Sequence, residues 1–358
     1  MHVKKVMAEN VYQKMHVRTG MTEKEERRAQ MTSIREVAAR AGVSPATVSR
    51  VLNGTARVDE EKRERVEKAI KETGFRPNEL ARALYRKSSK VIGVLVPDIE
   101  NPFFSELAKA VEEEAYANGY RMLLCNSDDR EEKELENMQM LAQLQADGVI
   151  LMTNTGKYSQ MYEKFSMPVV FVDRRLEEME RAGIVEADHY AGGKLAAEHL
   201  IACGCRKITC IRGPQELSSG RKRYEGYCEV CRQHGIGERF VDGSYHYEDG
   251  GRAAEEVLRR YPDTDGIIAG NDMTAVSVYK MLRKKGYRVP EDIQLIGFDG
   301  VKLGRFLTPE LTTVAQPIAE MGKCAVQMIL KTVQQVAHES EKRFPVTLIQ
   351  GETTKSKR

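Results

Sequence analysis

Apolar and polar positions follow two different periods along this chain, and the change falls near residue 90. Up to that point the apolar residues recur with the spacing of amphipathic helices, and no segment has the pattern of a strand. Beyond it, short runs rich in valine, isoleucine and leucine alternate with helical patterns that often close on glycine. We therefore predict a helical head followed by a body of a different fold class.

Three helices are predicted in the head. The first covers residues 34–41, and the second, after a tight turn, begins at Pro45 and ends near residue 52. Ser44 is suited to cap the second helix, because its hydroxyl oxygen accepts a hydrogen bond from a free backbone N–H group. The third helix is predicted from Asp59 to just before Gly74. Two short helices joined by a glycine-containing turn are typical of a helix-turn-helix.

The body is predicted to be α/β. Continuous apolar strands separated by helices are typical of parallel sheets that are covered by helices on both faces. The segment after residue 90 is long for one such domain, so we predict two α/β lobes, with residues 85–90 as the linker to the head. The predicted strands are residues 91–98, 121–127, 148–153, 168–173, 207–213, 266–272 and 293–300.

Charge separates the same two parts. Residues 1–90 contain 21 Lys and Arg against 12 Asp and Glu, a net charge of +9, while residues 91–358 contain 35 against 41, a net charge of −6. A basic head on an acidic body is expected when one end meets a polyanion such as DNA. Charge alone is also compatible with a basic segment that only keeps a helical unit soluble.

Composition argues against a membrane or secreted protein. The chain is 41% hydrophobic, its mean hydropathy is −0.49, and no apolar run approaches the roughly 20 residues that a membrane-spanning helix needs. The first residues lack the apolar core of a secretory signal. Seven cysteines, an odd number without framework spacing, indicate reduced thiols and a cytoplasmic protein.

The second helix of the head is expected to enter the major groove of DNA with its first residues facing the bases. Arg50 offers two hydrogen bonds to guanine, and Pro45 and Ala46 offer apolar contact. Spacing alone leaves open a small helical bundle that serves protein contacts. Phosphate contacts, which position the protein without reading sequence, are predicted for Ser33, Thr47, Ser49 and Asn53.

A resemblance decides between these interpretations. The segments IREVAARAGVSPATVSRVLNG (34–54) and GFRPNELARAL (74–84) resemble the head of the LacI/GalR family of bacterial transcription regulators. The resemblance extends through nearly all of residues 32–358, and it implies operator DNA as a partner and a homodimer. It also implies a helix-turn-helix domain at 32–76 and a hinge helix with its linker at 77–89. In the hinge, the implied DNA contacts are Asn78, Arg82 and Leu84, with Leu84 as a wedge between base pairs of the minor groove.

No catalytic set stands out in the body. The stretch TNTGKYS (153–159) lacks parts of a phosphate-binding loop, and no nucleophile or zinc-protease motif is found. The pairs Cys203/Cys205 and Cys228/Cys231 have the residue type of a zinc site. However, the second pair falls in a predicted helix, where cysteines three residues apart usually pack. We therefore predict no enzyme, no catalytic residue, no metal and no cofactor.

Polar and aromatic residues lie instead at the ends of the predicted strands, where parallel α/β sheets bind ligands. Carboxylate, amide and guanidinium groups pair with the hydroxyls of a sugar, and aromatic faces pack on its C–H surfaces. The set also resembles that of the ribose-binding members of the periplasmic binding-protein fold. That similarity maps onto Asn101, Phe103, Phe104, Asn154, Asp173, Arg174, Arg221, Asn271, Phe298, Asp299 and Gln316.

The predicted function is a repressor whose affinity for its operator is controlled by a small sugar bound between two lobes. Asn154, Asn271 and Gln316 favour ribose or a similar pentose, and the Asp173-Arg174 pair argues against a purine. A hexose or other sugar, and a non-sugar corepressor such as a purine, stay open. So does the sign of the response, inducer or corepressor.

Rival functions account for less of the sequence. A sugar-binding transport protein has no use for Arg50 or Leu84, and an α/β enzyme needs the catalytic motif that is lacking. The family topology implies three crossings between discontinuous lobes. Lobe 1 is expected at about 90–187 plus 318–345, and lobe 2 at about 188–317 plus 346–358.

Residues 1–31 precede the unit that resembles the family. Family members begin a few residues before the first helix, which is where Met31 lies. The preceding EKEERRAQ can be encoded by purine-rich codons that resemble a bacterial ribosome-binding site. We expect residues 1–31 to be a mis-assigned start or a disordered extension.

Overall fold

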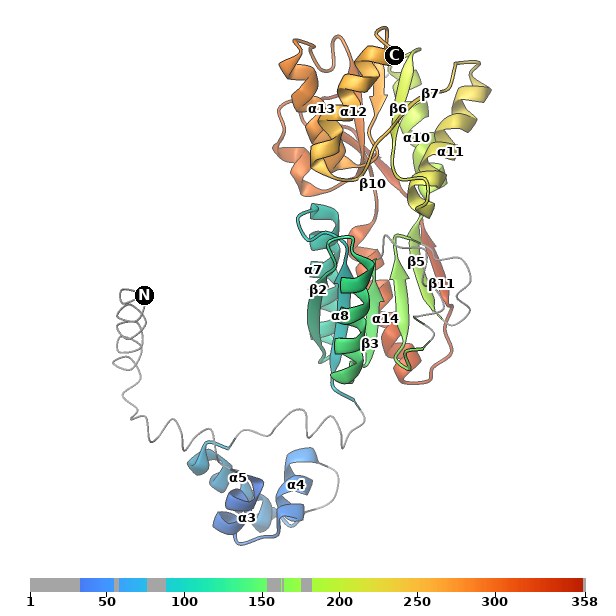
Figure 1. Ribbon diagram of the computed structural model, residues 1–358. Helices are drawn as coiled ribbons and strands as arrows, with labels where there is room; N and C mark the ends of the chain where they lie inside the picture. The colour runs from blue at the N-terminus through green and yellow to red at the C-terminus, as the bar shows by residue number, and fades with distance from the viewer. Residues whose placement is uncertain are drawn as a thin grey trace, which may run out of the picture. The chain divides into compact units, whose positions relative to one another are not determined.

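A computed structural model describes residues 33–54, 58–75, 88–152, 162, 164–174 and 182–356. The chain divides into two compact units, residues 1–86 and residues 87–358, which we call the head and the body (Figure 1). The predictions for residues 1–31, for Asn78, Arg82 and Leu84 in the hinge, and for Asn154 lie outside the described residues.

The head contains the three predicted helices. They are α3 (Ile34–Ala41), α4 (Pro45–Asn53) and α5 (Glu60–Thr73). Each ends on a glycine in the left-handed region, a conformation that glycine adopts without steric cost. The small core of this unit consists of the buried residues Val37, Ala38, Ala41, Val48, Val66 and Ala69.

The body contains two six-stranded sheets. Sheet A has the order β11-β5-β4-β3-β1-β2, and all its neighbouring strands are parallel. Together with the helices that cover it, this sheet forms lobe 1 (Figure 1). Its elements are β1 (Val91–Val96), α7 (Pro102–Ala117), β2 (Arg121–Asn126), α8 (Glu131–Gln143), β3 (Gly148–Leu151), β4 (Val169–Val172), β5 (Gly183–Ala187), α14 (Ile318–Val333) and β11 (Glu341–Phe344).

Sheet B has the order β12-β10-β9-β8-β6-β7 and forms lobe 2 with its own helices. Its strands are parallel except for the edge strand β12, which runs antiparallel to β10. The elements are α10 (His189–Ala202), β6 (Ile208–Arg212), α11 (Ser218–Gln233), β7 (Arg239–Asp242), α12 (Tyr247–Arg260), β8 (Gly266–Ile268), α13 (Asp272–Lys284), β9 (Gln294–Asp299), the 3-10 helix η1 (Lys302–Phe306), β10 (Thr312–Ala315) and β12 (Thr347–Ile349).

The chain crosses between the lobes three times. It leaves sheet A after β5, returns after β10 through α14, and leaves again between β11 and β12. In each sheet the strand order reverses between two neighbours, β1 and β3 in sheet A and β6 and β8 in sheet B. Ligands of such sheets bind beyond the carboxyl ends of the strands at these reversals.

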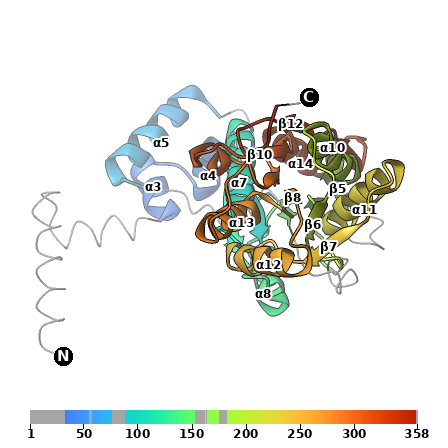
Figure 2. The ribbon, with the colours of Figure 1, turned by 90° about the horizontal axis from the view of Figure 1, so that it is seen from above.

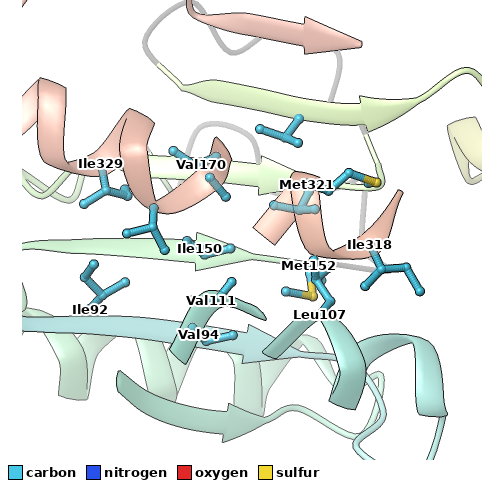
Figure 3. Close-up of a cluster of buried hydrophobic side chains, with 14 of the residues drawn as sticks. Ile92, Val94, Leu107, Val111, Ile150, Met152, Val170, Ile318, Met321 and Ile329 are labelled. Atoms are coloured by element: carbon cyan, nitrogen blue, oxygen red, sulfur yellow. The ribbon is translucent and has the colours of Figure 1, made fainter. Parts of the chain in front are cut away.

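Helices cover both faces of each sheet, as the continuous apolar strands predicted. Figure 3 shows one face of sheet A, where Ile318, Met321 and Ile329 of α14 and Leu107 and Val111 of α7 pack on the strands. On sheet B, α10 and α11 bury one face, and α12 and α13 bury the other (Figure 2). The strands are therefore enclosed by two layers of apolar side chains.

Five strands were not among those predicted from apolar runs. They are β5, β7, β10, β11 and β12. Three of them are edge strands, which contact solvent on one side and so tolerate charged residues, as in the sequence EKRF of β11. The strand β5 contains the buried Glu186, and β10 contains two buried threonines, so neither has a continuous apolar run.

Candidate functional site

The second helix of the head presents an exposed face. Pro45, Ala46 and Arg50 are exposed on α4, whereas Val48 is fully buried against the other two helices. Ala46 and Arg50 are four residues apart and therefore lie on the same face of the helix. This is the geometry that a recognition helix needs to reach base edges with an arginine.

Two of the residues predicted to contact phosphate also have a local role. The Ser33 hydroxyl caps α3 by accepting a hydrogen bond from the backbone N–H of Glu36 at 3.3 Å. The Thr47 hydroxyl lies 3.0 Å from that of Ser44, which itself caps α4 by accepting from the Thr47 backbone N–H. Ser49 is partly exposed on α4, and Asn53 is the last residue of that helix.

A second cluster joins the two lobes of the body. From lobe 1 it contains Asp173 and Arg174, which directly follow β4, and from lobe 2 it contains Asp299 and Gln316 at the ends of β9 and β10. All four are buried. The Gln316 side-chain amide donates to Asp299 Oδ1 at 2.9 Å, and Arg174 Nε lies 3.5 Å from Asp173 Oδ2. The structure therefore brings together four of the residues predicted to bind an effector.

The arginine at the centre of this cluster is Arg223, two residues after the predicted Arg221. Arg223 Nη2 lies 3.4 Å from Asp299 Oδ1 and 3.9 Å from Asp173 Oδ1, and Nη1 donates to the Gly270 carbonyl at 2.7 Å. Arg221 Nη1 instead donates to the carbonyl of Gln215 at 3.2 Å. The two arginines share the first turns of α11 but point to different surroundings.

Glycines at the crossing of α10 and α11 explain the position of Arg223. A Cβ atom at Gly193 would collide with the carbonyl oxygen of Arg223, and one at Gly226 would collide with that of Tyr190. The two helices therefore approach closely, and residue 223 lies on the same face of α11 as Gly226 because they are three apart. This spacing is the sequence signal that distinguishes Arg223 from Arg221.

The guanidinium of Arg223 stacks on the ring of Phe298. Its ring is fully buried in the core of lobe 2, and the Arg223 guanidinium carbon lies 3.7 Å from the ring centroid. Such stacking of a guanidinium on an aromatic face is attractive because the face carries negative charge density. Phe298, predicted to contact the effector, thus contacts the arginine.

Aromatic rings also flank Arg174. Its guanidinium carbon is 5.5 Å from the ring centroids of both Phe104 of lobe 1 and Tyr245 of lobe 2. Phe103 packs edge-on against Phe104 in the core of lobe 1. Tyr245 was missed by the sequence prediction because it follows the edge strand β7, which has no continuous apolar run. Burial raises the pKa of Tyr245, so its hydroxyl is a hydrogen-bond donor at neutral pH.

Two predicted asparagines have their amides engaged in helix caps. The Asn101 side-chain oxygen accepts from the Phe103 N–H at 3.1 Å at the start of α7. The Asn271 oxygen accepts from the Thr274 N–H at 2.8 Å at the start of α13, and its Nδ2 donates to the Tyr245 carbonyl at 3.0 Å. Asn271 therefore fixes the backbone of Tyr245 through its carbonyl.

The carboxylates of the cluster are held in strained backbone. Asp173 and Asp299 have φ angles of 70° and 115°, a region that residues other than glycine rarely adopt. Next to Asp299, the backbone N–H groups of Gly300 and Val301 donate to the buried Asp272 at 2.8 and 2.9 Å. Burial raises the pKa of Asp299 to about 7, against the opposing effect of Arg223.

Two acceptor atoms of the cluster stand out. Asp173 Oδ1 and Gln316 Oε1 are fully buried, and no group of the described residues donates a hydrogen bond to either. Buried polar atoms in proteins almost always have a partner. With the guanidinium of Arg223 beside them, these oxygens form a set of acceptors and donors suited to a ligand that carries several hydroxyl groups.

The lobes also meet outside this cluster. His246 Nε2 of lobe 2 lies 3.1 Å from Asp129 Oδ2 of lobe 1, and the Lys302 N–H donates to Glu106 at 2.9 Å. The hydrogen bond to Asp129 raises the pKa of His246.

The part of the chain that the structure describes contains no cluster of three His, Cys, Asp or Glu residues arranged to bind a metal. Cys228 and Cys231, weighed above as zinc ligands, are buried with Tyr227 in the core of lobe 2, and burial raises the pKa of both thiols. None of the helices in the described ranges is long and apolar enough to span a membrane.

Comparison with known families finds two matches. Residues 33–78 match the family described as bacterial regulatory proteins, lacI family. Residues 89–356 match the periplasmic binding proteins and sugar binding domain of the LacI family.

Among curated proteins, the chain is 41% identical over 326 residues to the ribose operon repressor of Halalkalibacterium halodurans, covering 91% of this chain and 98% of that protein. It is also 41% identical over 327 residues to the ribose operon repressor of Bacillus subtilis, covering 91% and 99%. The HTH-type transcriptional repressor PurR of Erwinia tasmaniensis is 35% identical over 317 residues, covering 87% and 93%.

Among solved structures, the Lac repressor dimer bound to operator and the anti-inducer ONPF matches with a TM-score of 0.81 and 26% identity, covering 91% of this chain and 99% of that one. The complex of the transcriptional regulator CelR with cellobiose matches with a TM-score of 0.70 and 28% identity, covering 90% and 99%.

Proposed function

This chain belongs to the LacI family of bacterial regulatory proteins, and from that premise we propose that it is a transcriptional repressor whose affinity for operator DNA is controlled by ribose. The predicted family and fold class are confirmed by these matches, and so is the expectation of a regulator rather than an enzyme. A repressor of this kind acts as a homodimer on DNA in the bacterial cytoplasm.

The observation that carries the sugar assignment is the pair of buried acceptors, Asp173 Oδ1 and Gln316 Oε1, beside the donors of Arg223. A pentose offers hydroxyl groups as donors and acceptors together, which matches both kinds of group. Phe104 and Tyr245 supply aromatic surface near the same point. Ribose itself is supported by the two ribose operon repressors, each 41% identical over nine-tenths of this chain.

We assign DNA binding to the exposed face of α4. Arg50 is the base-reading residue, Pro45 and Ala46 make apolar contacts, and the phosphate contacts include Ser33, Thr47, Ser49 and Asn53 as predicted from the sequence. The hinge contacts Asn78, Arg82 and Leu84 and the effector contact Asn154 are retained as proposals from the family resemblance alone.

The lobes supply the switch. Because sugar-binding residues come from both lobes, a bound sugar favours the arrangement of lobes in which all of them contact it. For the sugar to control DNA binding, this arrangement must bind the operator with a different affinity from the arrangement without sugar. A hundredfold preference of the sugar for one arrangement corresponds to about 2.7 kcal/mol per site.

The proposal is tested by selecting a duplex for the full-length protein from a random-sequence DNA pool, then titrating ribose into the complex while fluorescence anisotropy reports DNA binding. We expect ribose to change the DNA affinity at least tenfold. Arg50→Ala should lose DNA affinity but keep ribose binding, whereas Asp299→Asn should keep DNA binding but lose the response. A complex that ribose leaves unchanged would exclude ribose as the effector.

A purine is the second candidate, because the PurR repressor of Erwinia tasmaniensis is 35% identical over most of this chain. The buried Asp173–Arg174 pair favours a sugar over a purine, since neighbouring hydroxyl groups can donate to the carboxylate and accept from the guanidinium at the same place. Adenine and guanine in the same titration separate the two candidates.

A further inference from the structure

We propose that His189 is a positioning residue of the sugar site. Its neutral imidazole forms one hydrogen bond with Asp173 of lobe 1 and another with Arg223 of lobe 2, and so fixes the position of one relative to the other. The expected effect of His189 on ribose affinity rests on the proposed sugar-binding function. The protonation of its two ring nitrogens can be measured without any sugar.

His189 lies where the chain first crosses between the lobes. It is the first residue of α10, two residues after β5 ends at Ala187, and its side chain is 0% exposed. Asp188 caps this helix by accepting a hydrogen bond from the Ala191 N–H at 2.9 Å, which fixes the first turn. The imidazole packs against the ring of Phe298, with the centroids 6.0 Å apart.

The hydrogen bonds define which ring nitrogen carries the proton. Arg223 Nε lies 3.3 Å from His189 Nδ1, and an arginine N–H group is always a donor, so Nδ1 must present a lone pair. The proton of the neutral ring is therefore on Nε2. That nitrogen lies 2.9 Å from the carbonyl oxygen of Asp173 and donates to it.

The surroundings also keep the ring neutral. A second proton on Nδ1 would face the N–H of Arg223 and remove the bond between them. The charged groups that act on the ring are Arg223 from α11, Asp173 from lobe 1, and Glu186 on β5. Burial, together with Arg223, lowers the pKa of His189 to about 4, and the two carboxylates offset this only in part.

Each of the two bonds positions a residue of the proposed sugar site. Asp173 has a φ of 70°, and its strained backbone is held by the carbonyl bond to His189 and by its own N–H donating to the Val185 carbonyl at 2.9 Å. The bond to Nε sets the orientation of the Arg223 guanidinium, whose far side lies beside Asp299. His189 thus determines where the acceptor of one lobe lies relative to the donors of the other.

Three substitutions separate the two bonds. His189→Gln keeps an amide donor near the Asp173 carbonyl, His189→Asn keeps an acceptor near Arg223 Nε, and His189→Phe keeps the ring volume without either bond. Titration calorimetry with ribose should give about a 10- to 100-fold lower affinity for His189→Phe, as for two hydrogen bonds to the sugar lost when Asp173 and Arg223 are displaced, and intermediate losses for the other two.

His199 provides the matched control. It is a second buried histidine of α10, and its Nε2 lies 2.8 Å from the Thr354 hydroxyl, on residues that do not belong to the sugar site. His199→Phe should lower the melting temperature of the protein but leave its ribose affinity unchanged. An unchanged ribose affinity of His189→Phe would overturn the inference.

Nitrogen-15 NMR of the imidazoles tests the mechanism on sugar-free protein. Of the seven histidines, the signals absent in His189→Phe belong to His189. We expect a protonated Nε2 and an unprotonated Nδ1 that stay constant from pH 6 to pH 8. A protonated Nδ1, or a titration near pH 6.5, would overturn the inference whether or not ribose binds. If the wild-type protein fails to bind ribose, the proposed effector is wrong, and the NMR result alone then decides the role of His189.

Discussion

Replacing Arg223 by lysine tests the centre of the proposed sugar site, and the same change at Arg221 is the control. The two arginines are two residues apart in α11. Both substitutions keep the positive charge and have similar effects on the helix, because arginine and lysine have close helical propensities. Any difference between the variants therefore reports what the two guanidinium groups contact.

The expected loss follows from the contacts of Arg223. Its guanidinium bonds His189, the Gly270 carbonyl and Asp299 through three different nitrogens, at 3.3, 2.7 and 3.4 Å. A lysine ammonium is a single point of charge and cannot reach all three positions. A displaced ammonium would lose hydrogen bonds to the sugar, and two such bonds of about 1 kcal/mol each amount to about 2 kcal/mol, or roughly a 30-fold lower ribose affinity.

Calorimetry measures this affinity, and thermal denaturation checks it. A ribose concentration 100 times the wild-type dissociation constant stabilises the wild-type protein by about 2.7 kcal/mol. At the same concentration, a 30-fold weaker variant gains only about 0.9 kcal/mol. We expect Arg221→Lys to behave like the wild type. If Arg221→Lys loses ribose affinity and Arg223→Lys does not, the placement of Arg223 in the site is wrong.

Three further predictions concern titration and packing. Ribose affinity should rise between pH 6 and pH 8 in calorimetry, because burial raises the pKa of Asp299 to about 7 and the carboxylate accepts more hydrogen bonds than the acid; a flat profile contradicts this role. Gly193→Ala should destabilise the body by about 1–3 kcal/mol in chemical denaturation, since the new Cβ meets backbone, whereas Gly251→Ala, whose Cβ has only ordinary contacts, should not. Glu186→Gln should cost about 1–2 kcal/mol at pH 7, because the buried carboxylate loses its charge-assisted hydrogen bonds to Lys222 and Arg343, which are both partly exposed. Burial raises the pKa of Glu186 but its two cationic partners lower it below 4.5, so in acid denaturation the gap should narrow below that pH, and a constant gap would argue against an ionised Glu186.

Much of the fold follows from local patterns. The three head helices were predicted because each has a cap residue, a helical apolar face and a terminal glycine. Most interior strands were predicted because both of their faces are buried, which favours continuous apolar runs. The interior strands β5 and β10 were not, because a buried glutamate and two buried threonines interrupt their runs. Edge strands lack this requirement, and β11, with the sequence EKRF, has no apolar run to detect.

The candidate site was predicted less completely, because its geometry depends on contacts between distant segments. Strand-end positions identified Asp173, Asp299 and Gln316, since the ends of parallel strands converge. Arg223 and Arg221 are the same residue type and lie two residues apart on α11. What distinguishes Arg223 is that it lies on the same face of the helix as Gly226, which closely approaches α10. His189 has no signal of its own, because its role arises from two partners that its position between the lobes brings together.

The three crossings between the lobes also set the order in which this protein can be completed during synthesis. Helix α14, which covers one face of sheet A, is translated only after all the helices of lobe 2, and the edge strands β11 and β12 come later still. A nascent chain therefore carries an unfinished sheet A with exposed apolar surface while most of lobe 2 is being made, which is the condition under which chains aggregate or need chaperones. A premature stop after residue 316 would leave both sheets without an edge strand, so such a fragment would contain neither lobe in complete form.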